Sequence, residues 1–165
     1  GLIFRRIGLD VITVRAFNIF GIGQSSDFVV GKIVNRLLSE GAGEEGAVLE
    51  LGFTGAYRDF CDVDDVSRTL IAIARTDQTF PEVLNICTGK ATKIDHILEY
   101  VKKRTGSRVR INSCQSSGSA TSDSVYGSNE LLTKSLVDIS FQDVYSTIDK
   151  MIEFREANPL EPARK

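Results

Sequence analysis

Several residue types that mark particular protein classes are scarce in this sequence. It has no tryptophan, one methionine, one histidine, three prolines and three cysteines among 165 residues. The few prolines and the ordinary shares of apolar and charged residues exclude a disordered or fibrous chain. No apolar run approaches the ~18 residues that a membrane-spanning helix needs, and no charged-then-apolar signal pattern is present. We therefore expect a globular, cytoplasmic protein of one unit, 1–165, with no membrane contact.

Charge balance and cysteine spacing exclude further classes. Twenty basic residues against 22 acidic ones give a net charge of −2, so no electrostatic footprint for nucleic acid is expected. Cys61, Cys87 and Cys114 are odd in number and far apart, which fits neither a disulfide framework nor a zinc site. Because Cys61 and Cys87 lie in apolar, strand-like runs, we expect both to be buried thiols.

Hydrophobic periodicity predicts a mixed α/β chain. Strands are expected at 10–17, 48–51, 57–63, 83–87 and 108–111, and helices at about 27–40, 62–80, 93–105, 129–136 and 143–156. The 83–87 run is almost continuously apolar, as parallel strands buried on both faces are. The pattern gives at least two strands of this buried parallel kind, and two strands alone cannot make a stable doubly wound sheet. The chain is therefore either a compact α+β unit or part of a larger sheet whose other strands lie upstream of Gly1.

Two local patterns suggest nucleotide phosphates or metal, and each has a simpler explanation. The Gly21-x-Gly23 turn lies between a strand and a helix, as a dinucleotide fingerprint requires, but Ser26 occupies the third glycine position. The acidic run from Asp59 to Asp65 could hold a divalent cation. Capping of the next helix by Asp62, Asp64 or Asp65, at the positive end of its dipole, explains these three carboxylates more simply, so no metal is expected.

Four segments taken in order resemble one family. They are VRAFNIFGIGQSSDFVVGKI, YRDFCDVDDVSRTLIAI, EVLNICTGKATKIDHILEYV and GSNELLTKSL. The chain resembles the C-terminal half of the extended short-chain dehydrogenase/reductases, the NAD-dependent epimerase/dehydratase proteins that act on nucleotide sugars. The similarity is nearest to the branch of GDP-mannose 4,6-dehydratase and GDP-4-keto-6-deoxymannose reductase. It implies the last parallel strands of a Rossmann-like sheet plus a small α+β substrate-binding domain.

The resemblance also implies roles for particular residues. Asn18 and Arg58 match family positions that bind the substrate phosphates or sugar, and a guanidinium suits phosphate bidentately. Phe17 matches the position beside the nicotinamide. The start of the next helix, with Phe28, Val29 and Lys32, matches a substrate-binding segment, where backbone N–H groups favour an anion. Strand alternation predicts Arg58 and Phe60 on one face, with Tyr57, Asp59 and Cys61 on the other.

Each of these residues also has an explanation without a ligand. Arg58 could form only an ion pair with Asp59, Lys32 could be a solvated helix residue, and Asn18 could only form a turn. The lone His96 lies beside apolar helix positions without catalytic partners, and we expect a partly exposed structural histidine. No catalytic residue is assigned within the chain.

For the intact protein, the resemblance implies an enzyme that changes C4 of a nucleotide-linked hexose with NAD or NADP, acting as a homo-oligomer. The cofactor would be bound mainly by an upstream half that is absent here, so the chain alone is expected to be inactive. A non-catalytic regulator of the same fold and a free-standing interaction module are the alternatives, and one departure from the family favours the regulator. The loop from Gln115 to Ser124 has no Arg or Lys, whereas the family usually has an arginine there that binds the diphosphate.

Overall fold

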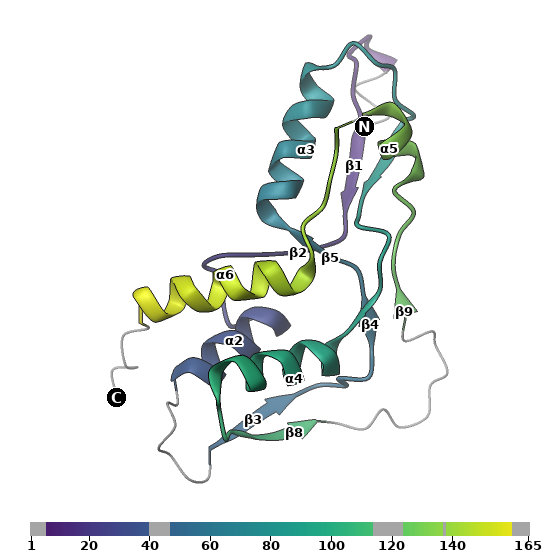
Figure 1. The fold of residues 1–165 in the computed structure, drawn as a ribbon. Helices are drawn as coiled ribbons and strands as arrows, with labels where there is room; N and C mark the ends of the chain where they lie inside the picture. The colour runs from purple at the N-terminus through teal and green to yellow at the C-terminus, as the bar shows by residue number, and fades with distance from the viewer. Residues whose placement is uncertain (1–5, 40–46, 114–123, 137, 160–165) are drawn as a thin grey trace.

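The computed structural model describes residues 6–39, 47–113, 124–136 and 138–159 (Figure 1). The chain is a mixed α/β fold in which two regions lie one above the other in Figure 1. We call them the sheet region and the helical region. None of the described helices combines the length and apolar character that crossing a lipid bilayer requires.

The sheet region is built on two parallel strands, β1 (Thr13–Ala16) and β6 (Val83–Ile86). Helix α3 (Val63–Arg75) lies on one side of β1 and helix α5 (Glu130–Ser135) on the other (Figure 1). Their shared core consists of the buried residues Cys61, Val66, Ile73, Phe80, Leu84, Ile86, Cys87 and Leu132. The predicted parallel strands of a Rossmann-like sheet are therefore present.

The helical region packs three helices on one another, namely α2 (Val29–Ser39), α4 (Ile94–Thr105) and α6 (Val144–Ala157). The parallel strands β3 (Val48–Leu51) and β8 (Arg110–Ser113) adjoin them. Apolar residues of α4 recur at i, i+3, i+4 and i+7, which explains why one face of the helix is buried. This region holds the larger core cluster, with fully buried side chains from all three helices.

Short strands connect the two regions. Strand β2 (Asn18–Phe20) pairs in parallel with β5 (Phe60–Asp62). Strand β4 (Tyr57–Arg58) pairs with β7 (Thr92–Lys93) on one edge and with β9 (Ser124–Val125) on the other. At residues 17 and 59 the chain passes from one sheet to another within a single residue, beside the predicted phosphate-binding side chains.

The structure corrects two strand predictions. The single strand expected at 57–63 is two strands in different sheets, interrupted at Asp59. The expected alternation fails as a result, because Phe60, Cys61 and Asp62 are all buried in succession. The 83–87 strand is not buried on both faces: Leu84 and Ile86 are buried, whereas Val83 is 38% exposed. The described residues fully cover only one face of β6.

Helix ends follow local chemistry more closely. The Asp62 carboxylate caps α3 by accepting hydrogen bonds from the backbone N–H groups of Asp64 and Asp65, as predicted. Helix α4 ends at Gly106, whose φ of 67° is a left-handed conformation that glycine adopts without strain. Helix α3 ends at Arg75, five residues before the predicted stop. The sequence pattern also predicts the tail of a helix at 1–6, which, like the loop at 115–124, lies mostly outside the described residues.

Candidate functional site

Asn18 is the first residue of β2 and follows directly after the half-buried Phe17. Its side chain is exposed, but its orientation is fixed, because Nδ2 donates a hydrogen bond to the backbone carbonyl oxygen of Asp59 at 2.7 Å. Asp59 is the neighbour of Arg58 in the chain. The structure therefore brings Asn18 to the segment that carries Arg58, although 40 residues separate the two in sequence.

Arg58 is half-buried at the end of β4. Its Nη1 donates a hydrogen bond to the backbone carbonyl oxygen of the preceding Tyr57 at 2.7 Å. The arginine stands where β4 is paired on both edges, opposite Thr92 on one side and Val125 on the other. A paired strand holds the backbone that carries the guanidinium, which is the rigidity that a phosphate-binding side chain requires.

Asp59 lies between β4 and β5, at a point that we call the junction, and its relative exposure is 0%. Its Oδ1 accepts hydrogen bonds from the backbone N–H of Thr88 at 2.9 Å and from the Thr88 hydroxyl at 2.6 Å. Its Oδ2 accepts from the backbone N–H groups of Gly89 at 2.9 Å and Gly127 at 3.4 Å. We call these four residues the Asp59 cluster. Reasoning from sequence missed this cluster, because it considered Asp59 only as a member of an acidic run, as a strand residue and as a possible ion-pair partner of Arg58.

Phe17 lies at the carboxyl end of β1, and its backbone N–H donates to the carbonyl oxygen of Ile86 at 2.9 Å. The ring packs against the core of the sheet region. A Cβ at Gly127 would lie 2.6 Å from both Phe17 Cζ and Cys87 Sγ, so only glycine allows this approach. The residue predicted beside the nicotinamide is thus held by the same segment that the Asp59 cluster fixes.

Of the predicted residues of the α2 segment, Lys32 contacts β3, whereas Phe28 and Val29 do not line the space between α2 and β3. Phe28 is 60% exposed just before the helix, and Val29 is half-buried against the helical core. Lys32 Nζ donates a hydrogen bond to the backbone carbonyl oxygen of Glu50 at 2.7 Å. Lys32 and Glu50 also line a cavity of about 350 Å³ between α2 and β3.

Side chains that sequence reasoning did not single out hold the turn before α2. The Gln24 side chain donates to the carbonyl oxygen of Ile19 at 3.0 Å and accepts from the N–H of Gly31 at 3.0 Å. Buried Asn35 donates to the carbonyl oxygen of Gln24 at 3.3 Å and accepts from Arg155 Nε at 2.9 Å. A Cβ at Gly31 would lie 2.3 Å from a backbone oxygen of the same turn. A glycine inside an otherwise apolar helical pattern was the available signal.

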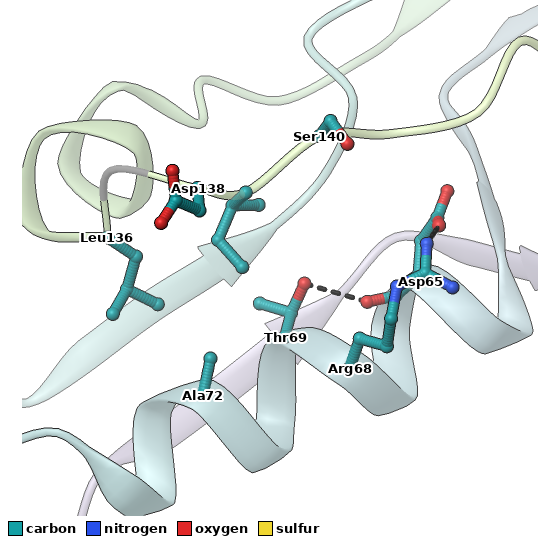
Figure 2. A pocket seen from close by; sticks show the side chains of 8 residues that line it. Asp65, Arg68, Thr69, Ala72, Leu136, Asp138 and Ser140 are labelled. Atoms are coloured by element: carbon teal, nitrogen blue, oxygen red, sulfur yellow. Dashed lines mark hydrogen bonds and ion pairs between the residues drawn. The ribbon is translucent and has the colours of Figure 1, made fainter.

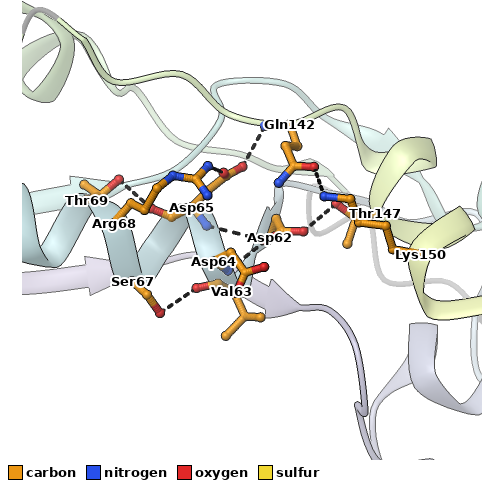
Figure 3. Close-up of polar contacts among 10 residues, drawn as sticks. All are labelled: Asp62, Val63, Asp64, Asp65, Ser67, Arg68, Thr69, Gln142, Thr147 and Lys150. Carbon is orange, nitrogen blue, oxygen red and sulfur yellow. Dashed lines mark hydrogen bonds and ion pairs between the residues drawn. The ribbon is translucent and has the colours of Figure 1, made fainter. Parts of the chain in front are cut away.

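The rest of the acidic run organises the amino end of α3 (Figure 3). Asp62 Oδ2 accepts a hydrogen bond from the Thr147 hydroxyl of α6 at 2.7 Å, and Asp65 pairs with Arg68 and accepts from the backbone N–H of Gln142. Within the described ranges, no three His, Cys, Asp or Glu side chains are grouped so that they could hold a metal ion. The carboxylates therefore join α3 to the segment around α6.

A second cavity, of about 360 Å³, lies between α3 and residues 136 and 138–140. Figure 2 shows Thr69 and Ala72 of α3 facing Leu136 and Ser140 across it. The residues predicted to bind substrate or cofactor do not line this cavity. It is therefore separate from the candidate site.

The two predicted buried thiols lie beside the Asp59 cluster and are confirmed as fully buried. Burial and the nearby Asp59 carboxylate raise the pKa of Cys61 to about 12 and that of Cys87 to about 11. At neutral pH both are uncharged and unreactive, because the thiolate is the nucleophilic form. Neither is a candidate nucleophile, and Cys114 lies outside the described residues.

Comparison with known proteins identifies the family. The model of the NAD dependent epimerase/dehydratase family matches residues 3–87, about half of the chain. The chain belongs to this family. The resemblance predicted from the four sequence segments is confirmed.

Two curated relatives match part of the chain. The dTDP-6-deoxy-L-talose 4-dehydrogenase of Kitasatospora kifunensis is 30% identical over 95 residues, which are 58% of this chain and 30% of the relative. The GDP-6-deoxy-D-mannose reductase of Pseudomonas aeruginosa is 30% identical over 92 residues, 56% of this chain and 30% of the relative. The matched part is thus about a third of either relative.

Solved structures show the same fold. RMD from Pseudomonas aeruginosa, complexed with NADPH, has a TM-score of 0.81 at 22% identity, covering 93% of this chain and 51% of that chain. A UDP-glucuronic acid 4-epimerase from Bacillus cereus, in complex with UDP-glucuronic acid and NAD, has a TM-score of 0.77 at 16% identity, covering 94% of this chain and 48% of that chain. The predicted fold class is confirmed, and the chain spans about half the length of these solved relatives.

Proposed function

We propose that this chain supplies the sugar-nucleotide site of an NAD(P)-dependent enzyme that epimerises, dehydrates or reduces a nucleotide-linked hexose at C4. Family membership supports the reaction class. The names of the two curated relatives support GDP- and dTDP-linked hexoses as probes. The observation that carries the proposal is the hydrogen bond from Asn18 to the backbone of Asp59, since it brings one predicted phosphate ligand to the residue next to the other, Arg58.

The diphosphate of the substrate would bind between Asn18 and Arg58. One N–H of the Asn18 carboxamide is used by the Asp59 carbonyl, and its second N–H and its Oδ1 remain as a donor and an acceptor. A guanidinium offers planar donors that match phosphate oxygens bidentately. The amide can therefore bind either a phosphate oxygen or a sugar hydroxyl next to it.

The α2 segment would bind the same substrate from the helical region. Lys32 donates one hydrogen to the Glu50 carbonyl, and its ammonium has two more to offer an anion or a hydroxyl. Exposed Phe28 gives a flat apolar surface for a base or sugar ring. Val29 supplies an N–H in the first turn of α2, where the helix dipole favours negative charge.

NAD or NADP would be held mainly by residues outside this chain, with Phe17 as its contact here. The position fits this role, because Phe17 is half-buried at the carboxyl end of a parallel strand, where α/β sheets bind ligands. When bound, the cofactor supplies hydride exchange with the hexose. Asn18, the next residue, would then orient the sugar relative to it. We also propose that the intact protein is a homo-oligomer.

A non-catalytic regulator of the same fold is the second candidate. It is favoured by the loop 115–124, which lacks any Arg or Lys to grip the diphosphate. A regulator would bind the nucleotide sugar without turnover in the intact protein, whereas the enzyme would convert it.

Calorimetric titration of the 165-residue chain with GDP-mannose, UDP-glucose and dTDP-glucose tests the proposal. We expect saturable binding of at least one, weakened by about tenfold or more in Asn18→Ala and in Arg58→Ala, because each removes hydrogen bonds to a charged group. Arg75→Ala is the matched control. This arginine lies at the carboxyl end of α3, whereas the candidate site lies near the amino end, so the substitution should leave affinity unchanged. Equal binding by all variants, or turnover by the chain alone, would refute the proposal.

A further inference from the structure

The buried carboxylate of Asp59 is held by uncharged hydrogen-bond donors. Its carboxylate is fully buried, and its donors in the described structure are backbone N–H groups, the Thr88 hydroxyl and, at 3.8 Å, the Cys61 thiol. None of these donors is a cation. Removing a carboxylate from water is unfavourable unless hydrogen bonds replace its hydration. The number of donors on both oxygens explains how it is accommodated.

The residue type follows from the number of acceptors needed. Both oxygens of a carboxylate accept hydrogen bonds, and neither carries a hydrogen to donate. The amide of an asparagine has a single accepting oxygen, and its NH₂ group would face the N–H groups of Gly89 and Gly127. Only an aspartate of this length accepts from all of these groups together.

The cluster gathers three segments that are far apart in the chain. Thr88 and Gly89 form the turn after β6, with Gly89 at a φ of 76°, and Gly127 lies just before α5. The Asp59 backbone also takes part, since its N–H donates to the carbonyl oxygen of Val125 at 3.1 Å and its carbonyl accepts from Asn18. One residue therefore connects β2, β9 and the turn after β6.

Each connection ends at a residue of the proposed site. The carbonyl of Asp59 orients the Asn18 carboxamide, its peptide bond continues into Arg58, and its carboxylate holds Gly127 against the Phe17 ring. A carboxylate that served only stability could stand anywhere in the core. Asp62, three residues further on, is such a case, because its partners are the amino end of α3 and Thr147 of α6.

We propose that Asp59 is a positioning residue, whose buried carboxylate fixes this junction so that Asn18 and Arg58 are aligned for one diphosphate. It does not itself touch the ligand. This inference rests on the proposed function. Asp59 is not among the residues predicted to bind the ligand, yet it would determine how tightly Asn18 and Arg58 bind it.

A double-mutant cycle on the 165-residue chain tests the inference, with GDP-mannose, UDP-glucose or dTDP-glucose as the probe, whichever wild type binds. Asp59→Asn should weaken binding by about tenfold, and the matched variant Asp62→Asn by less than about twofold. In the Asn18→Ala background, the loss caused by Asp59→Asn should shrink to about threefold or less, because part of it acts through Asn18. Thr88→Val removes only the hydroxyl donor, and it serves if Asp59→Asn does not fold.

The Asn18 side-chain NH₂ signals in a ¹⁵N-correlated NMR spectrum give a reading without ligand. They should shift in Asp59→Asn or Thr88→Val and stay in place in Asp62→Asn. The inference is overturned if the affinity of the folded variant equals that of wild type, if the losses are additive with Asn18→Ala, or if those signals do not move. Failure of wild type to bind any of the three probes refutes the proposed function as well. Wild-type binding together with an unaffected Asp59→Asn refutes the positioning role alone.

Discussion

The helical region and the sheet region bury their apolar side chains to different degrees. In the helical region, Ile33, Ile97, Val101 and Ile148 have no exposure above 1%, and three helices close the core. In the sheet region, Leu70 and Ile71 of α3, Val83 of β6 and Leu131 of α5 are each 38% exposed or more. No large apolar residue of the described helices α2, α4 or α6 is exposed to that degree, whereas α3, α5 and β6 of the sheet region each present at least one.

The exposed apolar residues of the sheet region agree with the length of the solved relatives. The solved relatives are about twice as long as the matched part, and a parallel sheet is normally covered on both faces. We expect the exposed apolar residues of the sheet region to contact further chain or a second copy. The candidate site lies where the two regions meet, so both contribute to it.

Truncation of one buried isoleucine in each region should have the largest effect on stability. Ile97→Ala in the helical region and Ile86→Ala in the sheet region both remove a fully buried isoleucine, with an expected loss of about 2–5 kcal/mol in the free energy of unfolding. The loss should be larger for Ile97, because the more open sheet region can relax around the cavity. Urea unfolding measures both. A larger loss for Ile86→Ala would mean that the sheet region is packed as rigidly as the helical one.

Removal of the connection between the regions should have the next largest effect. Asp62 caps α3 and accepts a hydrogen bond from Thr147 of α6, so Asp62→Ala should cost about 1–3 kcal/mol of stability and leave the Thr147 hydroxyl without its partner. Asp64→Ala is the control, since this neighbouring aspartate is exposed and should change stability by less than about 0.5 kcal/mol. Thermal unfolding followed by circular dichroism distinguishes them, and equal losses would contradict a connecting role.

Alkaline pH should destabilise the sheet region through its thiols. The pKa values of Cys61 and Cys87 are raised to about 12 and about 11, so both thiols stay protonated in the folded chain while they ionise above about 9 when it unfolds. The unfolded state then binds fewer protons. Stability is unaffected below pH 9 and falls above it, by on the order of 1 kcal/mol per thiol at pH 10. In Cys61→Ala/Cys87→Ala the fall between pH 8 and 10 should be smaller; an identical fall would assign it to other groups.

The smallest effect on stability is expected at an exposed apolar residue of α3. Ile71 is 51% exposed, and Ile71→Ser should change the free energy of unfolding by less than about 0.5 kcal/mol. It should, however, reduce self-association of the chain in sedimentation velocity, because it removes exposed apolar surface from the sheet region. Phe154→Ser on α6 is the control from the helical region. If both substitutions reduce association equally, the sheet region is not the contact surface.

Features set by local chemistry could be predicted from the sequence. Helix α4 with its Gly106 stop and the Asp62 cap of α3 depend on residues within a few positions of each other, and the structure confirms them. The candidate site was predicted only through the family resemblance. Its ligand-binding residues stay a prediction, although the structure does place Asn18 beside the Arg58 segment.

The junction at Asp59 could not be predicted, for a physical reason. Its hydrogen-bond donors lie 29, 30 and 68 residues further along the chain, so no local pattern reports them. Period-two alternation also assumes one continuous strand, and it fails where β4 gives way to β5 in another sheet. A short run of apolar and acidic residues is compatible with one continuous strand and also with two strands in different sheets.

The most direct measurement of the central claim is an NMR titration of the 165-residue chain with GDP-mannose, UDP-glucose and dTDP-glucose. It follows the side-chain signals of the Asn18 amide and the Arg58 guanidinium. We predict that both signals move together, with one saturation curve, as one of these ligands is added. Saturable binding that leaves both signals in place, or no binding of any of the three, would contradict the claim that this junction holds the linked phosphates.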